Sequence, residues 1–273
     1  MKATIFLILL VLTLSLVAQE NSGYNPNSIR PIHVSDIMYK KTVTRNIDLR
    51  EKQNKSLFSV NREITRVIID AVKEGRLKVY QSDSLDLGKV LTKEKFLENL
   101  KVPASGPELT EEEKKFMQQG ANDNVFGGPV QVSSGPAYFE PNQLYQLTLV
   151  EDFIIDKQRS RAYWDIQCLA IVVTAELNQK VDLPAGWFKY KDLVEIFKKD
   201  PRAIWFNPEN DQEHRNMADA FDLRLFSSYI TKVSNPSNAY LTEIYSESAK
   251  QGLMASYWAA NALMEYEHNL WEF

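Results

Sequence analysis

The residue types that most often bind metals or attack substrates are sparse and scattered in this sequence. The three histidines, His33, His214 and His268, lie far apart, and no two of them are four residues apart on one helical face. Neither an HExxH nor a CxxC motif is present. The single cysteine, Cys168, lies in an apolar run that disfavours its thiolate, so we interpret it as a small buried hydrophobe. These patterns predict no metal site and no thiol nucleophile.

Patterns for other reactions are equally weak. No G-x-S-x-G nucleophile motif occurs, and Gly127-Gly128-Pro129 is not a Walker-type phosphate-binding loop. Glu151 and Asp152 are neighbours on a predicted strand, so their side chains should point to opposite faces of the sheet. We therefore expect a protein that is not an enzyme and that holds no cofactor. A site assembled from distant residues would carry no such local motif.

Aromatic and arginine side chains point instead to binding. Tyrosine, tryptophan and arginine are the residue types that most often anchor protein interfaces. The tryptophans have several arginines near them in the sequence; they are Trp164, Trp187, Trp205, Trp258 and Trp271. The formal net charge of −4 argues against a broad attraction to nucleic acid.

The N-terminus reads as a cleavable signal peptide over residues 1–18. Lys2 is followed by an apolar run, and Ala18 precedes a polar stretch, which suits cleavage after Ala18. The run is about 13 residues long, whereas a membrane-spanning helix needs about 20. No cysteine lies near the cleavage point to carry a lipid, and no second stretch is long enough to span a membrane. We therefore expect export, with residues 19–35 as an extended N-terminal arm.

Hydrophobic periodicity then predicts strands and helices in alternation. Residues 42–49, 144–155 and 163–173 read as strands, the last two as a hairpin. Helical spacing predicts helices after Asn61, after Thr92, over 191–199 and over 217–229. The predicted fold class is α+β, with an antiparallel sheet and helices packed on it.

Breaks in the pattern suggest how the chain is divided. Residues 120–141, rich in glycine and proline, read as a loop or linker between an N-terminal lobe (36–119) and a C-terminal lobe (142–245). Each lobe contains a helix followed by a short strand, so the two could be similar. An internal repeat of 42–100 and 163–232 is a hypothesis that a superposition would test.

The last segment, 246–273, predicts a long helix with an aromatic tail. Leu253, Tyr257, Ala260 and Met264 form one helical stripe, and Met254 and Trp258 widen it. The helix either folds back onto the domain or presents a docking face. Folding back is the commoner arrangement.

Three stretches of the chain carry distinctive residue patterns. The first runs from Asp36 to Lys41 and on through Arg45-Asn46-Ile47-Asp48-Leu49-Arg50-Glu51-Lys52-Gln53-Asn54. The second is 221–232, which contains Arg224-Leu225-Phe226-Ser227-Ser228-Tyr229, and the third is the terminus 268–273. These stretches resemble the GldN (PorN) family of gliding motility and type IX secretion proteins from Bacteroidetes. Leu225 stands where a family member would place Met, Asn269 replaces the usual Asp, and residues 80–160 match only loosely.

The resemblance implies a non-catalytic subunit located in the periplasm. It implies a ring-like complex with a GldK- or PorK-like outer-membrane lipoprotein and with further copies of the chain. It also implies contact with the periplasmic domains of a GldM- or PorM-like inner-membrane motor protein, and no contact with nucleic acid.

Partner contacts are expected in two places, the 42–54 stretch and the aromatic C-terminus, with ordinary core packing as the alternative for both. The residues singled out are Arg45, Asp48, Arg50, Tyr257, Trp258, Trp271 and Phe273. Two other functions remain open. A periplasmic hydrolase would need convergent polar side chains in a deep pocket, and a ligand-binding protein would need a closed apolar pocket.

Overall fold

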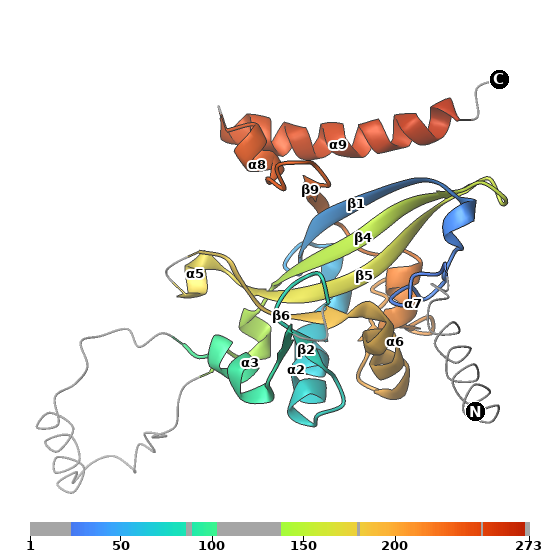
Figure 1. Cartoon of the computed structure of the whole chain (residues 1–273). Coiled ribbons are helices and arrows are strands. Elements are labelled where there is room, and N and C mark those ends of the chain that lie inside the picture. The colour runs from blue at the N-terminus through green and yellow to red at the C-terminus, as the bar shows by residue number, and fades with distance from the viewer. Residues whose placement is uncertain (1–22, 86–88, 103–137, 179–180, 247, 271–273) are drawn as a thin grey trace, which may run out of the picture.

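The computed structural model describes residues 23–85, 89–102, 138–178, 181–246 and 248–270. Within them, seven strands form one antiparallel sheet, and two short strands form a separate ribbon. Helices pack on the sheet, and a long helix ends the described chain (Figure 1). The predicted α+β class is confirmed.

The longest strands form the middle of the sheet. Strands β4 (Gln146–Asp156) and β5 (Arg161–Val173) form the predicted hairpin. Strand β1 (Ile37–Asp48) pairs with the other edge of β4 over its whole length. The second half of β5, from Ile166 to Val173, is apolar nearly throughout, as expected for a strand that is covered on both faces.

Shorter strands extend the sheet on both sides. Strands β6 (Leu183–Lys189), β2 (Val79–Tyr80) and β3 (Val90–Leu91) follow β5, and β9 (Tyr229–Val233) pairs with β1. The order is β3-β2-β6-β5-β4-β1-β9. The sequence pattern missed β6 and β9 as strands.

Both predicted lobes contribute to this one sheet. Strands β1 to β3 come from residues 36–119, and β4, β5, β6 and β9 come from residues 142–245. The lobe boundaries and the internal repeat stay predictions. The signal peptide (1–18) and nearly all of the predicted linker (120–141) lie outside the described residues.

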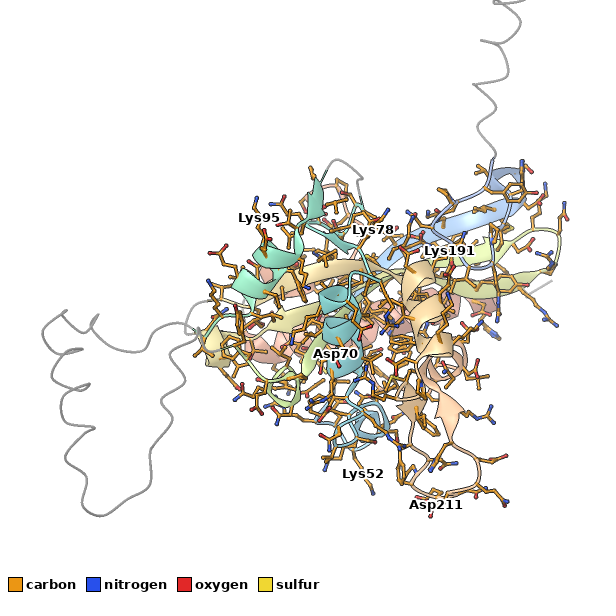
Figure 2. All side chains as sticks on the ribbon, turned by 90° about the horizontal axis from the view of Figure 1, so that it is seen from below. Lys52, Asp70, Lys78, Lys95, Lys191 and Asp211 are labelled. Carbon is orange, nitrogen blue, oxygen red and sulfur yellow. The ribbon has the colours of Figure 1, made fainter. Side chains whose placement is uncertain are left out.

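Four helices cover the lower side of the sheet in Figure 1: α2 (Ile64–Lys73), α3 (Lys93–Asn99), α6 (Tyr190–Lys199) and α7 (Met217–Asp222). Seen from below, α2 and α6 lie side by side, and the loop that carries Asp211 projects beyond them (Figure 2). The apolar faces of these helices form the main core with the sheet, as their helical spacing predicted.

Short elements complete the fold. The short helices are η2 (Val34–Asp36), η3 (Asn54–Leu57), η5 (Pro141–Gln143), α5 (Ala175–Asn178) and α8 (Leu241–Ile244). The separate ribbon is β7 (Ile204–Trp205) with β8 (Arg215–Asn216).

The C-terminal helix α9 (Ala249–Asn269) lies above the sheet (Figure 1). A second apolar cluster joins it to the sheet through Leu263 on the helix and Val43, Phe153 and Ile230 on three strands. Leu149 and Phe153 point to the same face of β4, because they are four residues apart on one strand. Leu149 nevertheless belongs to the main core and Phe153 to this second cluster. Strand twist explains how one face of β4 meets helices below the sheet at one end and α9 above it at the other.

The prediction of a helix over residues 217–229 is correct for 217–222 and wrong beyond Asp222. Helix α7 ends at Asp222, and Arg224 adopts a left-handed backbone with φ 54°. The Arg224 and Leu225 N–H groups bond back to the carbonyls of Phe221 and Ala220, which is the Schellman pattern of a helix end. The chain then turns and enters β9, because pairing with β1 is available there.

A pH-dependent contribution to stability is expected from the end of α6. Arg202 donates to Asp200 at 2.9 Å and to Asp70 at 2.7 Å, and the Arg202 hydrogen bonds hold the pKa of Asp200 below its usual value. We expect Asp200→Asn to lower the free energy of unfolding by about 1.5–3 kcal/mol at neutral pH. Because the folded-state pKa is depressed, this difference should be complete above about pH 4 and vanish as the pH falls through the folded-state pKa.

Urea unfolding at about pH 7 and about pH 3 would measure the difference. Asp211→Asn, at an exposed loop, is the matched control, with an expected change within about 0.5 kcal/mol. The same Asp200→Asn deficit at both pH values would contradict the assignment.

Candidate protein-interaction surfaces

Arg45, the first of the residues predicted to bind a partner, is engaged inside the fold. It pairs with Glu151 on β4, whose side chain is completely buried. Arg224 pairs with the same carboxylate, at 2.7 Å from Nη1 to Oε2. Both guanidinium groups lie over the ring of Trp164, at 4.7 and 4.9 Å from its centroid. These contacts are structural, and a partner contact for Arg45 stays a prediction.

Asp48 and Arg50 meet at the end of β1. Arg50 Nη2 donates to Asp48 Oδ2 at 2.9 Å, and the Arg50 guanidinium lies 3.6 Å over the ring of Tyr145. Burial raises the pKa of Asp48, but the Arg50 hydrogen bonds outweigh it and leave that pKa below its usual range. The Arg50 side chain is about half exposed, so this pair is accessible to a partner. Its role as a contact stays a prediction.

The first two stretches that carry the family resemblance lie side by side. Strands β1 and β9 pair directly. The Asn54 amide is buried and donates to the carbonyls of Asp48 and Ser227, and it accepts from the Ser227 N–H at 2.7 Å. The two stretches therefore build one corner of the fold, and these residues hold that corner together.

Helix α9 docks on the fold through small residues. Gly252, Ala255 and Ser256 are buried, and a side chain at Gly252 would meet Thr242 of α8 at 3.3 Å. Small side chains let the helix approach closely, and Leu263 fills the gap above the sheet. Folding back, one of the two predicted arrangements, is therefore present.

The predicted stripe points away from the fold except at Ala260, which packs against the second apolar cluster. Leu253 is 69% exposed, Tyr257 62% and Trp258 49%, and Tyr245 of the preceding turn packs edge-on against Trp258. We call this surface the outer face of α9, defined as Leu253, Met254, Tyr257, Trp258 and Met264. Contiguous exposed apolar side chains on a folded chain mark an interaction surface. The helix thus folds back and also leaves this apolar face exposed, and a docking role for the face stays a prediction.

The structure brings only some of the predicted residues together. Asp48 contacts Arg50, and Tyr257 is the neighbour of Trp258 on α9, but no hydrogen bond, ion pair or ring contact between the described residues joins these two pairs. Trp271 and Phe273 lie outside the described residues. Leu253, Met254 and Met264 were not among the residues predicted to contact a partner. Their helical spacing, opposite a run of glycine and alanine, was the signal that could have found them.

Cys168 is buried, as predicted. It lies on β5 with its Sγ 3.6 Å from the carbonyl of Asp83, and burial raises the pKa of its thiol. We expect iodoacetamide to modify it about 100-fold more slowly in the folded chain than in denaturant, because the thiolate is the reacting form. Mass spectrometry over a time course would measure both rates. Equal rates would contradict the buried position.

The described residues contain neither a cluster of metal ligands nor a membrane-spanning helix. Histidine, cysteine, aspartate and glutamate side chains form no group of three or more there that could hold a metal ion. No helix in the same ranges is long and apolar enough to cross a membrane.

Comparisons with known proteins place the chain in a family. A search of the curated proteins found no match. A family model described as "Gliding motility associated protein GldN" matches residues 32–272, which include all the strands and helices of the described fold. The chain therefore belongs to the GldN family, a component of the gliding motility and type IX secretion machinery.

Proposed function

We propose that the chain is a non-catalytic periplasmic subunit that forms a ring-like complex with a GldK- or PorK-like outer-membrane lipoprotein. In this proposal the complex also contacts the periplasmic domains of a GldM- or PorM-like inner-membrane motor protein. A subunit held by a lipidated partner is anchored through that partner's acyl chains. Family membership supports a role in the machinery, and the signal peptide predicted over residues 1–18 supports the location.

The observation that carries the proposal is the outer face of α9. Its large apolar side chains are exposed along one side of a helix whose other side is already packed. Aromatic side chains such as Tyr257 and Trp258 are enriched among residues that dominate binding energy. We assign the lipoprotein as the partner of this face.

A native pull-down from detergent-solubilised envelopes tests the proposal. One tag is placed after Phe273, and a second preparation carries the tag within residues 120–136, so that neither position alone decides the result. We expect both preparations to recover the lipoprotein in a large assembly. A clean monomer in both would contradict the ring-subunit function. Osmotic-shock fractionation of the same cells tests the location, and recovery in the cytoplasm would contradict it.

A further inference from the structure

The first half of β5 has an unpaired edge. Strand β5 pairs with β4 from Arg161 to Val172, but it pairs with β6 only from Cys168 to Val173. Among the described residues, 161–167 therefore have no strand neighbour on the β6 side. In an antiparallel strand, alternate residues direct both N–H and C=O groups to a given side, so this edge offers main-chain hydrogen bonds to an added strand. At the end next to β6, the Gln167 side chain donates to the Asp165 carbonyl and accepts from Asn25 of the arm.

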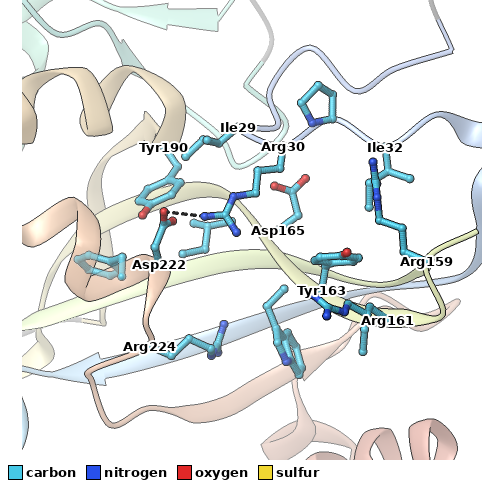
Figure 3. Close-up of a pocket in the computed structure, with 15 residues that line it drawn as sticks. Ile29, Arg30, Ile32, Arg159, Arg161, Tyr163, Asp165, Tyr190, Asp222 and Arg224 are labelled. Carbon is cyan, nitrogen blue, oxygen red and sulfur yellow. Dashed lines mark hydrogen bonds and ion pairs between the residues drawn. The ribbon is translucent and has the colours of Figure 1, made fainter.

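A cavity of about 670 Å³ runs along this edge. All of residues 161–166 line it, although successive side chains point to opposite faces of the sheet. This is expected for a cavity that lies at a strand edge and not over one face. The N-terminal arm contributes residues 29–32, α6 contributes Tyr190, and the end of α7 contributes Asp222 and Arg224 (Figure 3). Aromatic and aliphatic side chains thus alternate with charged ones around the space.

The charges around the cavity favour one carboxylate. Arg30 pairs with Asp222 at 3.2 Å, and Arg159 pairs with Asp156 at 3.1 Å. Arg161 forms no ion pair with another described residue. Arg45 shares Glu151 with Arg224, and the Lys40–Asp152 pair acts on Asp165. Together with these neighbours, six cationic groups lie around the cavity with five carboxylates; they are Arg30, Lys40, Arg45, Arg159, Arg161, Arg224, Glu151, Asp152, Asp156, Asp165 and Asp222.

One positive charge in excess suits a single carboxylate better than a dianionic phosphate. A phosphate would also lie close to the carboxylates of Asp165 and Asp222, which line the same cavity. A planar guanidinium such as that of Arg161 can bind a carboxylate with two parallel hydrogen bonds. The ligand chemistry is therefore that of an aspartate or glutamate side chain.

A buried donor without a partner lies at the same cavity. The Tyr190 side chain is only 1% exposed, and its hydroxyl has no hydrogen-bond partner in the described structure. It lies beside Asp222 at one end of the cavity (Figure 3). Burial raises the pKa of Tyr190, so the hydroxyl keeps its proton and remains a donor. Native structures rarely leave such a group unsatisfied, which makes a missing acceptor the natural explanation.

We propose that the 161–167 edge of β5 binds an extended segment of a protein partner by strand addition, with one carboxylate of that segment held by Arg161. Main-chain hydrogen bonds along the edge supply affinity, and alternate side chains of the segment select it. A carbonyl or carboxylate of the segment accepts from Tyr190, and an apolar neighbour packs against Tyr163. That the partner is a subunit of the secretion machinery rests on the proposed function. The binding chemistry is argued from the cavity alone.

Photo-crosslinking in cells tests this site with the full chain. The crosslinking residue p-benzoylphenylalanine replaces Tyr163 in one strain, Trp258 in a second and Asp211, on an exposed loop, in a third. We expect position 163 to crosslink to a protein segment that carries Asp or Glu next to an apolar residue, as identified by mass spectrometry. Arg161→Gln should lower that yield about tenfold, because it removes the charged half of the contact. Arg215→Gln, an exposed arginine outside the cavity, should leave it unchanged.

The outcomes separate this site from the proposed function. A crosslink at 258 without a protein crosslink at 163 overturns the β5 site and leaves the function standing. Absence of protein crosslinks at both positions overturns both. A crosslink at 163 only to lipid, or to a segment without a carboxylate, or one that Arg161→Gln does not weaken, also overturns the site. Equal yields at 163 and 211 would mean chance contact and would overturn it as well.

Discussion

Replacing Glu151 by glutamine is expected to lower the free energy of unfolding by about 3–5 kcal/mol, since it leaves buried charges without their partner. Glu151 lies between the two apolar clusters on the same face of β4, where its side chain is fully buried. Its carboxylate is the ion-pair partner of both Arg45 and Arg224. Glutamine preserves the shape but removes the negative charge. Urea unfolding of the mature chain, monitored by tryptophan fluorescence, would measure the change.

A matched control and a compensating variant make this result specific. Glu195→Gln removes an exposed carboxylate whose contact with Lys199 is 3.8 Å long, and it should change stability by less than about 0.5 kcal/mol. The triple variant Arg45→Met, Glu151→Leu and Arg224→Met removes all three charges. It should recover part of the stability, because buried ion networks can often be replaced by apolar side chains. A Glu151→Gln chain within about 1 kcal/mol of the wild type would contradict the assigned role.

Elements with a strong local pattern could be predicted from the sequence. The β4–β5 hairpin follows from two apolar runs on either side of a polar turn, the first alternating and the second nearly continuous, and α2 follows from apolar residues at helical spacing. Gly75 ends α2 with φ 75°, and Thr92 caps α3 by accepting from the Lys95 N–H, both as expected. In each case neighbouring residues alone decide the outcome.

Elements that depend on distant partners could not be predicted. Residues 223–229 look helical, but Arg224 is held by Glu151 from β4 and Ser227 by Asn54. Tertiary contacts therefore end the helix and favour a strand beside β1. The cavity at the β5 edge is likewise assembled from the arm, a strand and two helices, so no local spacing reveals it.

Residues that stabilise the fold differ from candidate binding residues in how far the chain itself satisfies them. Arg45 and Asn54 lie in a stretch that resembles the family, yet their polar groups are satisfied within the chain. The outer face of α9 is the opposite case, because Leu253, Tyr257 and Met264 remain exposed after the helix has packed. A surface that folding leaves exposed is the better candidate for a partner.

The double variant Tyr257→Ser and Trp258→Ser should weaken association with the lipoprotein partner at least about 100-fold, since central aromatic residues contribute about 2 kcal/mol or more each. Stability should fall by less than about 1 kcal/mol, because both side chains are largely exposed in the free chain. Purified chain and partner, titrated by biolayer interferometry, give the affinity, and thermal unfolding of the same samples gives the stability.

The control separates this face from exposed apolar residues in general. Val60 is 83% exposed and Val181 is 68% exposed, and neither lies on α9, so Val60→Ser with Val181→Ser removes apolar surface elsewhere. This control pair should bind like the wild type. If it weakens binding as much as the α9 pair, the effect is one of general surface hydrophobicity. If the α9 pair binds with unchanged affinity, the outer face of α9 is not the docking surface, because a helix side that contributes no affinity cannot be what holds the subunit in its complex.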